Sequence, residues 1–182
     1  YEVDDARGAA DWTPALFDEF RKRRGYNLEE HLPALFGRDT EEKNKRVLCD
    51  YRETISEMVL HHFTERWKEW AKSKSAIIRN QAHGAPSNIL DLYAVVDIPE
   101  IEGVEPLRIK MASSAGNVTG KKLVSSESAT WLNEHFESNL SDIKVALDRF
   151  MLNGVNHLFY HGTTYSPPGE PWPGWLFYAA VH

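Results

Sequence analysis

The stretch KLVSSESATWLNEHFESNLSDIKVALDRFMLNGVNHLFY (122–160) contains two short apolar runs separated by an amphipathic segment. Residues 122–127 (KLVSSE) predict a strand that ends at Glu127, and residues 140–152 carry apolar side chains at helical spacing. Asn153-Gly154 stop this helix, and residues 155–160 (VNHLFY) predict the next strand. This order of elements predicts two parallel strands joined by a right-handed crossover.

The same alternation continues toward the N-terminus. Further strands are predicted near residues 1–4, 77–79 and 94–98. Between the strands we expect helices over 13–25 with Thr13 as N-cap, and over 28–36, 41–72, 86–93 and 107–118. About five strand–helix units predict an α/β fold, either an open doubly wound sheet or part of a (β/α)8 TIM-like barrel. No glycine-rich phosphate loop follows any strand, which favours the barrel.

Length and composition indicate an ordinary globular domain. The chain has 182 residues, 42% of them hydrophobic and 26% charged, so residues 1–182 can form one domain. A net charge of −6 argues against a nucleic-acid partner, and no apolar run is long enough to predict a membrane span. The chain begins without Met and ends within an apolar run, so we expect a piece of a longer polypeptide that provides the remainder of the domain.

Polar side chains cluster where the predicted strands end, and the active site of a (β/α) barrel is built at that edge. Two carboxylates flanking the scissile bond are the basic equipment of most glycosidases. Glu2 and Glu127 lie on predicted strands far apart in the sequence, so they could face each other across the mouth of a barrel, which makes them the candidate catalytic pair. The other strand-end residues that we expect to contact a substrate are Asp4, Asp5, Gln81, His83, His157 and His161.

An acidic cluster at Asp97, Glu100 and Glu102 offers oxygen ligands of the kind that calcium prefers. The spacing is not that of an EF-hand, and an acidic loop neutralised by Lys or Arg fits the same pattern. Aromatic residues in predicted loops, Trp12 and Trp172 above all, could pack against a sugar ring.

Several motifs of this chain resemble the α-L-rhamnosidases of glycoside hydrolase family 106. The similarity runs in order through YEVDDARGAADWTP (1–14), CDYRETIS (49–56), RNQAHGAPSNILDLY (79–93), DIPE (97–100), GKKLVSSESATW (120–131) and NHLFYHGTTYSP (156–167). The resemblance implies a (β/α)-barrel segment, about five units of the catalytic domain of a large enzyme that bacteria secrete, or export to the periplasm, to degrade plant polysaccharides.

By the same resemblance, the enzyme would hydrolyse terminal α-L-rhamnosides with inversion and with the help of calcium. Glu2 would be the acid and Glu127 the base, with the metal near Glu100 and Asp97. Two alternatives stay open at this point: a carbohydrate-binding barrel fragment without catalysis, and a metal-dependent hydrolase of another substrate.

Overall fold

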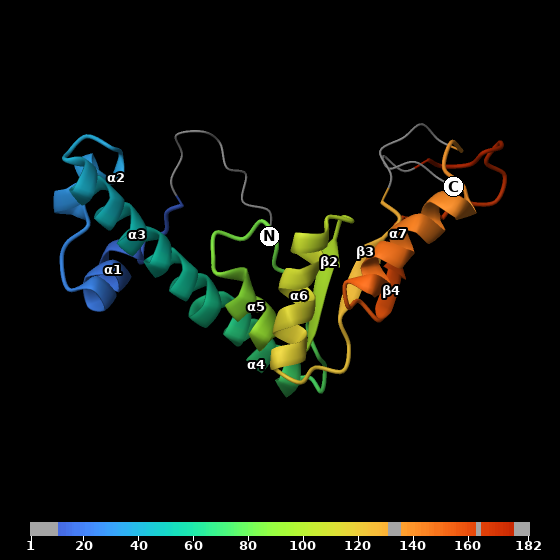
Figure 1. Ribbon diagram of the computed structural model, residues 1–182, viewed down its shortest axis with the longest axis horizontal. Helices are drawn as coiled ribbons and strands as arrows, with labels where there is room; N and C mark the ends of the chain where they lie inside the picture. Colours follow the sequence, from blue (N-terminus) through green and yellow to red (C-terminus); the bar gives the residue numbers. More distant parts are fainter. Residues whose placement is uncertain (1–10, 131–135, 163–164, 177–182) are drawn as a thin grey trace. The chain divides into compact units, whose positions relative to one another are not determined.

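The computed structural model describes residues 11–130, 136–162 and 165–176, and the chain divides into two compact units (Figure 1). Tyr1–Ile78 and Gly84–Val96 belong to the first, which we call the helical unit. Arg79–His83 and Asp97–His182 belong to the second, the sheet unit. Glu2, Asp4 and Asp5, with the predicted first strand, lie outside the described residues.

The helical unit is built around one long continuous helical rod. This rod consists of α3 (Glu41–Met58), the π-helical turn η2 (Val59–Thr64) and α4 (Glu65–Ser73), which confirms the helix predicted for residues 41–72. The other helices of the unit are α1 (Leu16–Arg24), η1 (Glu29–His31), α2 (Leu32–Leu35) and α5 (Ile89–Val95). Their core consists of the buried Leu16, Phe20, Leu28, Ala34, Val47, Tyr51 and Ile55.

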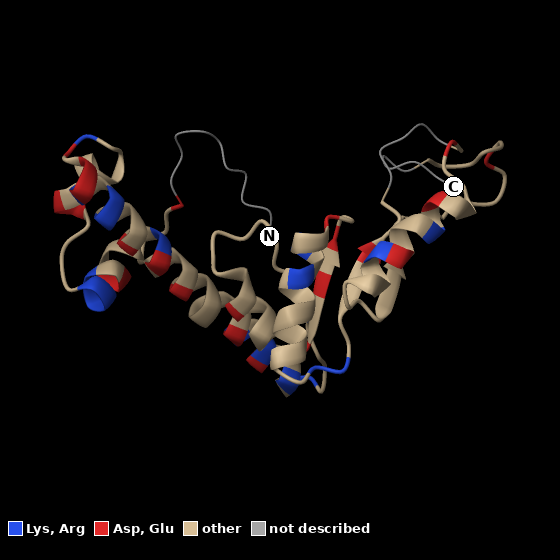
Figure 2. Ribbon diagram, viewed as in Figure 1, with Lys and Arg blue, Asp and Glu red and all other residues tan. Residues whose placement is uncertain are grey.

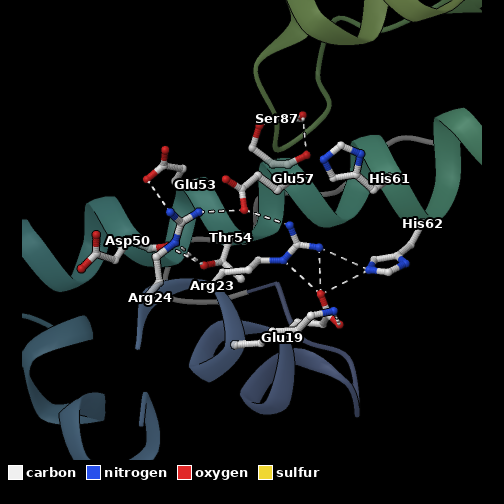
Figure 3. Close-up of polar contacts among 12 residues, drawn as sticks. Glu19, Arg23, Arg24, Asp50, Glu53, Thr54, Glu57, His61, His62 and Ser87 are labelled. Atoms are coloured by element: carbon white, nitrogen blue, oxygen red, sulfur yellow. Dashed lines mark hydrogen bonds and ion pairs between the residues drawn. The ribbon is translucent and has the colours of Figure 1, made fainter. Parts of the chain in front are cut away.

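Ion pairs and hydrogen bonds connect α1 to α3 (Figure 3). Arg23 bridges Glu19 at 2.8 Å and Glu57 at 3.0 Å, and Arg24 reaches Glu57 at 2.9 Å and Thr54 Oγ1 at 3.0 Å. The hydrogen bond from Arg23 is the main reason that the pKa of Glu19 lies below its ordinary value. Burial acts to raise the pKa of Glu57, but hydrogen bonds from Arg24 and Arg23 outweigh it and lower that pKa.

Two predictions about the helical unit are wrong in detail. Thr13 is not a side-chain cap, because α1 begins after Ala15 and Thr13 contributes only its carbonyl, which accepts from the Leu16 amide at 2.9 Å. Residues 94–95 are not strand, because α5 extends to Val95 after Asn88 caps its first turn. A short apolar run fits a buried helix as well as a strand, and periodicity alone does not separate the two.

Among its described residues, the sheet unit contains four parallel strands in the order β1-β2-β3-β4. They are β1 (Arg79–Gln81), β2 (Ile98–Glu102), β3 (Ser125–Ser128) and β4 (His157–Tyr160). The helix α6 (Pro106–Val118) connects β2 to β3, and α7 (Leu140–Leu152), with the predicted bounds, connects β3 to β4. The α/β fold with a parallel sheet is therefore confirmed.

The two faces of this sheet differ. Side chains alternate along a strand, so the strand pairing places Arg79, Gln81, Glu100, Glu102, Ser125, Glu127, His157 and Phe159 on one face, which we call the polar face. The helix α6 packs against the other face. A Cβ at Gly116 would lie 2.7 Å from Val124 Cγ2, so only glycine permits this close approach.

Candidate active site

Glu127 lies on the polar face near the carboxyl end of β3, and its side chain is 29% exposed. Both carboxylate oxygens face nitrogen atoms. The Gln81 amide donates a hydrogen bond from β1 to Oε2, and His161 Nδ1 lies 3.2 Å from Oε1. Glu127 is therefore partly open to solvent and held in one orientation from two sides.

Glu100 occupies the middle of β2 and is only 5% exposed. Its Oε1 accepts from Gln81 Nε2 at 3.1 Å, while Oε2 accepts from Ser125 Oγ at 2.7 Å and lies 3.0 Å from Arg79 Nε. The Arg79 guanidinium in turn lies 3.4 Å from the centre of the Phe159 ring, as a cation–π contact. A buried carboxylate needs this kind of compensation, and here the positive partner and two neutral donors provide it.

His161 follows β4 and belongs to the same group. Its Nδ1 lies 2.9 Å from Thr130 Oγ1, and its backbone amide donates to the Ser128 carbonyl at 2.8 Å. These contacts place the ring over the end of β3. Another histidine, His83, lies near an acid as well, with Nε2 3.9 Å from Glu102 Oε2.

A cavity of about 250 Å³ opens at this edge of the sheet. Glu102 and Glu127 line it together with Arg108, Thr130 and apolar atoms of α7. Glu102 and Glu127 are register partners on neighbouring strands, and the acidic positions of β2 can be followed in Figure 2. The carboxyl edge of the sheet thus combines the acids Glu102 and Glu127, the Arg108 guanidinium and a cavity, and these groups suit a polar substrate.

The predicted calcium pair does not fit a shared metal site. Asp97 precedes β2 and Glu100 is its third residue, so extended chain separates their Cα atoms by about 10 Å. The oxygens of Glu100 are already engaged by three donors, one of them the cationic Arg79. Across residues 11–130, 136–162 and 165–176, no three His, Cys, Asp or Glu side chains are placed to hold a metal ion.

The structure brings some of the predicted site residues together and not others. Gln81, Glu127 and His161 form one contact group, whereas His157 packs its ring on Phe159 with centroids 4.7 Å apart. Trp12 belongs to the helical unit and is exposed. Trp172 lies on the loop after β4 and is 84% exposed; its ring stacks on that of Phe136, with the ring centroids 5.6 Å apart.

Two residues of this contact group were not indicated by the sequence: Arg79 and Thr130. Arg79 shares the polar face with Gln81 two positions later, so strand alternation was the available signal for it. No signal in the sequence indicated Thr130, because its contact with His161 joins the ends of two strands separated by a helix.

In the part of the chain that the structure describes, no helix is both long and apolar enough to span a bilayer.

Comparison with known proteins gives a consistent result. The solved structure of a rhamnosidase from Novosphingobium sp. PP1Y superimposes with a TM-score of 0.71 and 22% sequence identity. The superposition covers 98% of this chain and 19% of that chain, so the present chain spans a small part of that protein's length. At this identity the similarity shows a shared fold over the segment.

A search of curated proteins finds no match. The sequence model of the glycoside hydrolase family 106, described as alpha-L-rhamnosidase, matches residues 3–180. This match includes nearly the whole chain and all the residues of the contact group around Glu127. The chain therefore belongs to glycoside hydrolase family 106, the α-L-rhamnosidase family.

Proposed function

We propose that this chain forms part of the (β/α)8-barrel catalytic domain of an enzyme that hydrolyses terminal α-L-rhamnosides. The observation that carries the proposal is the placement of Glu127. It lies near the carboxyl end of a parallel strand, on the polar face of the sheet, and has its two oxygens facing Gln81 and His161. The polar face of the sheet would then be the interior of the barrel, with α6 and α7 outside.

Glu127 is the proposed general base. In an inverting mechanism the base takes a proton from water while that water attacks the anomeric carbon, and the acid protonates the leaving oxygen from the other side. The Gln81 amide donates to one oxygen of Glu127, and donation to a carboxylate favours its ionised form, which suits the base and not the acid. Glu2, outside the described residues, stays the proposed acid.

The substrate contacts proposed for the remaining residues follow from their positions. His83 and His161 can reach sugar hydroxyls at the carboxyl edge, and the exposed ring of Trp172 can pack against the sugar beyond the scissile bond. Glu102 and Arg108, which line the cavity, extend this set. The proposed roles of Asp4 and Asp5 concern residues outside the described part.

Calcium stays a prediction from the family resemblance. Because Asp97 and Glu100 do not fit as a shared ligand pair, the ligands would have to come from other residues of the protein, and no step of the mechanism depends on the ion. Secretion or export to the periplasm of a bacterium, and a plant polysaccharide as the natural substrate, are proposals on the same ground.

The test is a screen of aryl glycosides with the full-length polypeptide that contains this chain. We expect turnover of the aryl α-L-rhamnoside and little turnover of other aryl glycosides, with β-L-rhamnose as the first product detected by NMR. Addition of a chelator, followed by calcium, checks the metal. Rhamnoside binding without turnover would favour the carbohydrate-binding alternative, and turnover that requires zinc would favour a different metal-dependent hydrolase.

A further inference from the structure

The side-chain amide of Gln81 contacts two carboxylates at once. From β1 its Nε2 donates to Glu100 Oε1 at 3.1 Å and also to Glu127 Oε2. A primary amide nitrogen carries two N–H groups, so one can serve each acid. Both donors of Gln81 are thereby committed to protein oxygens and are not available to a sugar hydroxyl.

The Glu100 end of this bridge is rigid. Glu100 is buried in the central part of the sheet, and its other oxygen is held by Ser125 Oγ at 2.7 Å and by Arg79 Nε at 3.0 Å. Arg79 is itself packed on the Phe159 ring. The contacts of Glu100 therefore come from β1 and β3, and through Arg79 they extend to β4, so that Glu100 cannot turn without disturbing several strands.

The Glu127 end is open to the site. Glu127 is partly exposed, and besides Gln81 it contacts His161, whose ring contacts Thr130. A flexible glutamate at the end of a strand would otherwise sample several rotamers. Because Gln81 is hydrogen-bonded to the fixed Glu100, its second hydrogen bond restricts the Glu127 side chain to one orientation.

We infer that Gln81 is a positioning residue for the base, anchored on the buried Glu100 that pairs with Arg79, and not a residue that binds the sugar. This inference rests on the proposed function of Glu127. It also gives Glu100 a role different from that of a metal ligand: its negative charge is balanced within the protein by Arg79 and serves to orient the Gln81 amide.

Two substitutions in the full-length polypeptide test the inference. Gln81→Met keeps the length of the side chain but removes both N–H groups, so kcat on an aryl α-L-rhamnoside should fall about ten- to hundredfold while KM stays within about twofold. Gln81→Glu is closer in shape, but it replaces the donors by a third carboxylate beside two others. At pH 7 it should lower kcat at least as much as Gln81→Met.

The matched control is Asn80→Met on the same strand, whose side chain lies on the opposite face by alternation and should leave kcat nearly unchanged. Wild-type kcat in Gln81→Met, or a loss confined to KM, would overturn the inference, the second outcome by making Gln81 a sugar ligand. Full activity in Gln81→Glu would show that shape and not hydrogen-bond donation matters. If the unaltered protein has no rhamnosidase activity, the proposed function itself fails, which is a different result from an active protein with indifferent variants.

Discussion

At the scale of single residues, the site depends on how the charge of Glu100 is compensated. Two acids, Glu100 and Glu127, contact the same amide; Glu100 also pairs with the Arg79 guanidinium, and Glu127 with the His161 imidazole. The buried acid is thereby committed to structure, because its oxygens are engaged. The partly exposed Glu127 keeps access to solvent, which a residue that activates water requires.

Replacement of Glu127 by Gln tests its proposed role as general base. The amide keeps the shape of the side chain but cannot accept the proton from water, so we expect kcat to fall about 10²- to 10⁴-fold with little change in KM. The measurement is steady-state hydrolysis of an aryl α-L-rhamnoside by the full-length polypeptide. Asp148→Asn, which removes an exposed acid of α7 paired with Lys144, is the control and should retain activity. A variant Glu127→Gln with more than a tenth of the normal kcat would contradict the assignment.

At the scale of elements, the helical unit relies on the cluster of ion pairs between α1 and α3 shown in Figure 3. Glu57 forms ion pairs with both Arg23 and Arg24, whose side chains are mostly buried. Because Glu57 and Glu19 have lowered pKa values in the folded chain, the unfolded chain binds protons more readily at these positions. Their contribution to stability is present above the unfolded value of about 4.3 and is lost as the pH falls through the folded values.

Glu57→Gln should therefore destabilise the chain at neutral pH by about 1–2 kcal/mol, after allowance for the partial exposure of the group. The difference from the unaltered chain should shrink between about pH 5 and pH 3. Urea unfolding followed by far-UV circular dichroism at several pH values measures it. The control is Glu41→Gln. Glu41 pairs with the exposed Lys45, so this substitution should lower the free energy of unfolding by only about a few tenths of a kcal/mol. A difference independent of pH would contradict the ionic explanation.

At the scale of the whole molecule, the described sheet is open. The order β1-β2-β3-β4 leaves β1 and β4 at its edges among the described residues, and the chain corresponds to 19% of the solved rhamnosidase. Edge strands expose unpaired backbone groups that favour association. The barrel that we propose needs further strands to close the sheet and complete the site.

We expect the isolated 182-residue chain to have little or no activity on an aryl α-L-rhamnoside, whereas the full-length polypeptide is active. Size-exclusion chromatography should show association of the isolated chain, because its sheet edges are not covered. Equal turnover by the two proteins would contradict the expectation.

The pattern of apolar residues was sufficient to predict the type and the order of most helices and strands. The helix over residues 140–152 and the long helix from Glu41 were predictable because an amphipathic pattern with a capping residue depends only on neighbours in the sequence. The strand-end rule likewise indicated Glu127, Gln81 and His161, because parallel strands place their carboxyl ends at one edge.

Only the tertiary structure decided which of these polar groups contact each other. The Gln81 bridge, the Arg79–Glu100 pair and the His161–Thr130 contact join residues 19 to 46 positions apart. No periodicity encodes such a contact, since it depends on strand order, register and side-chain rotamers. For that reason the sequence predicted Gln81, Glu127 and His161 as site residues, while only the fold showed that Arg79 pairs with Glu100 and that Thr130 contacts His161.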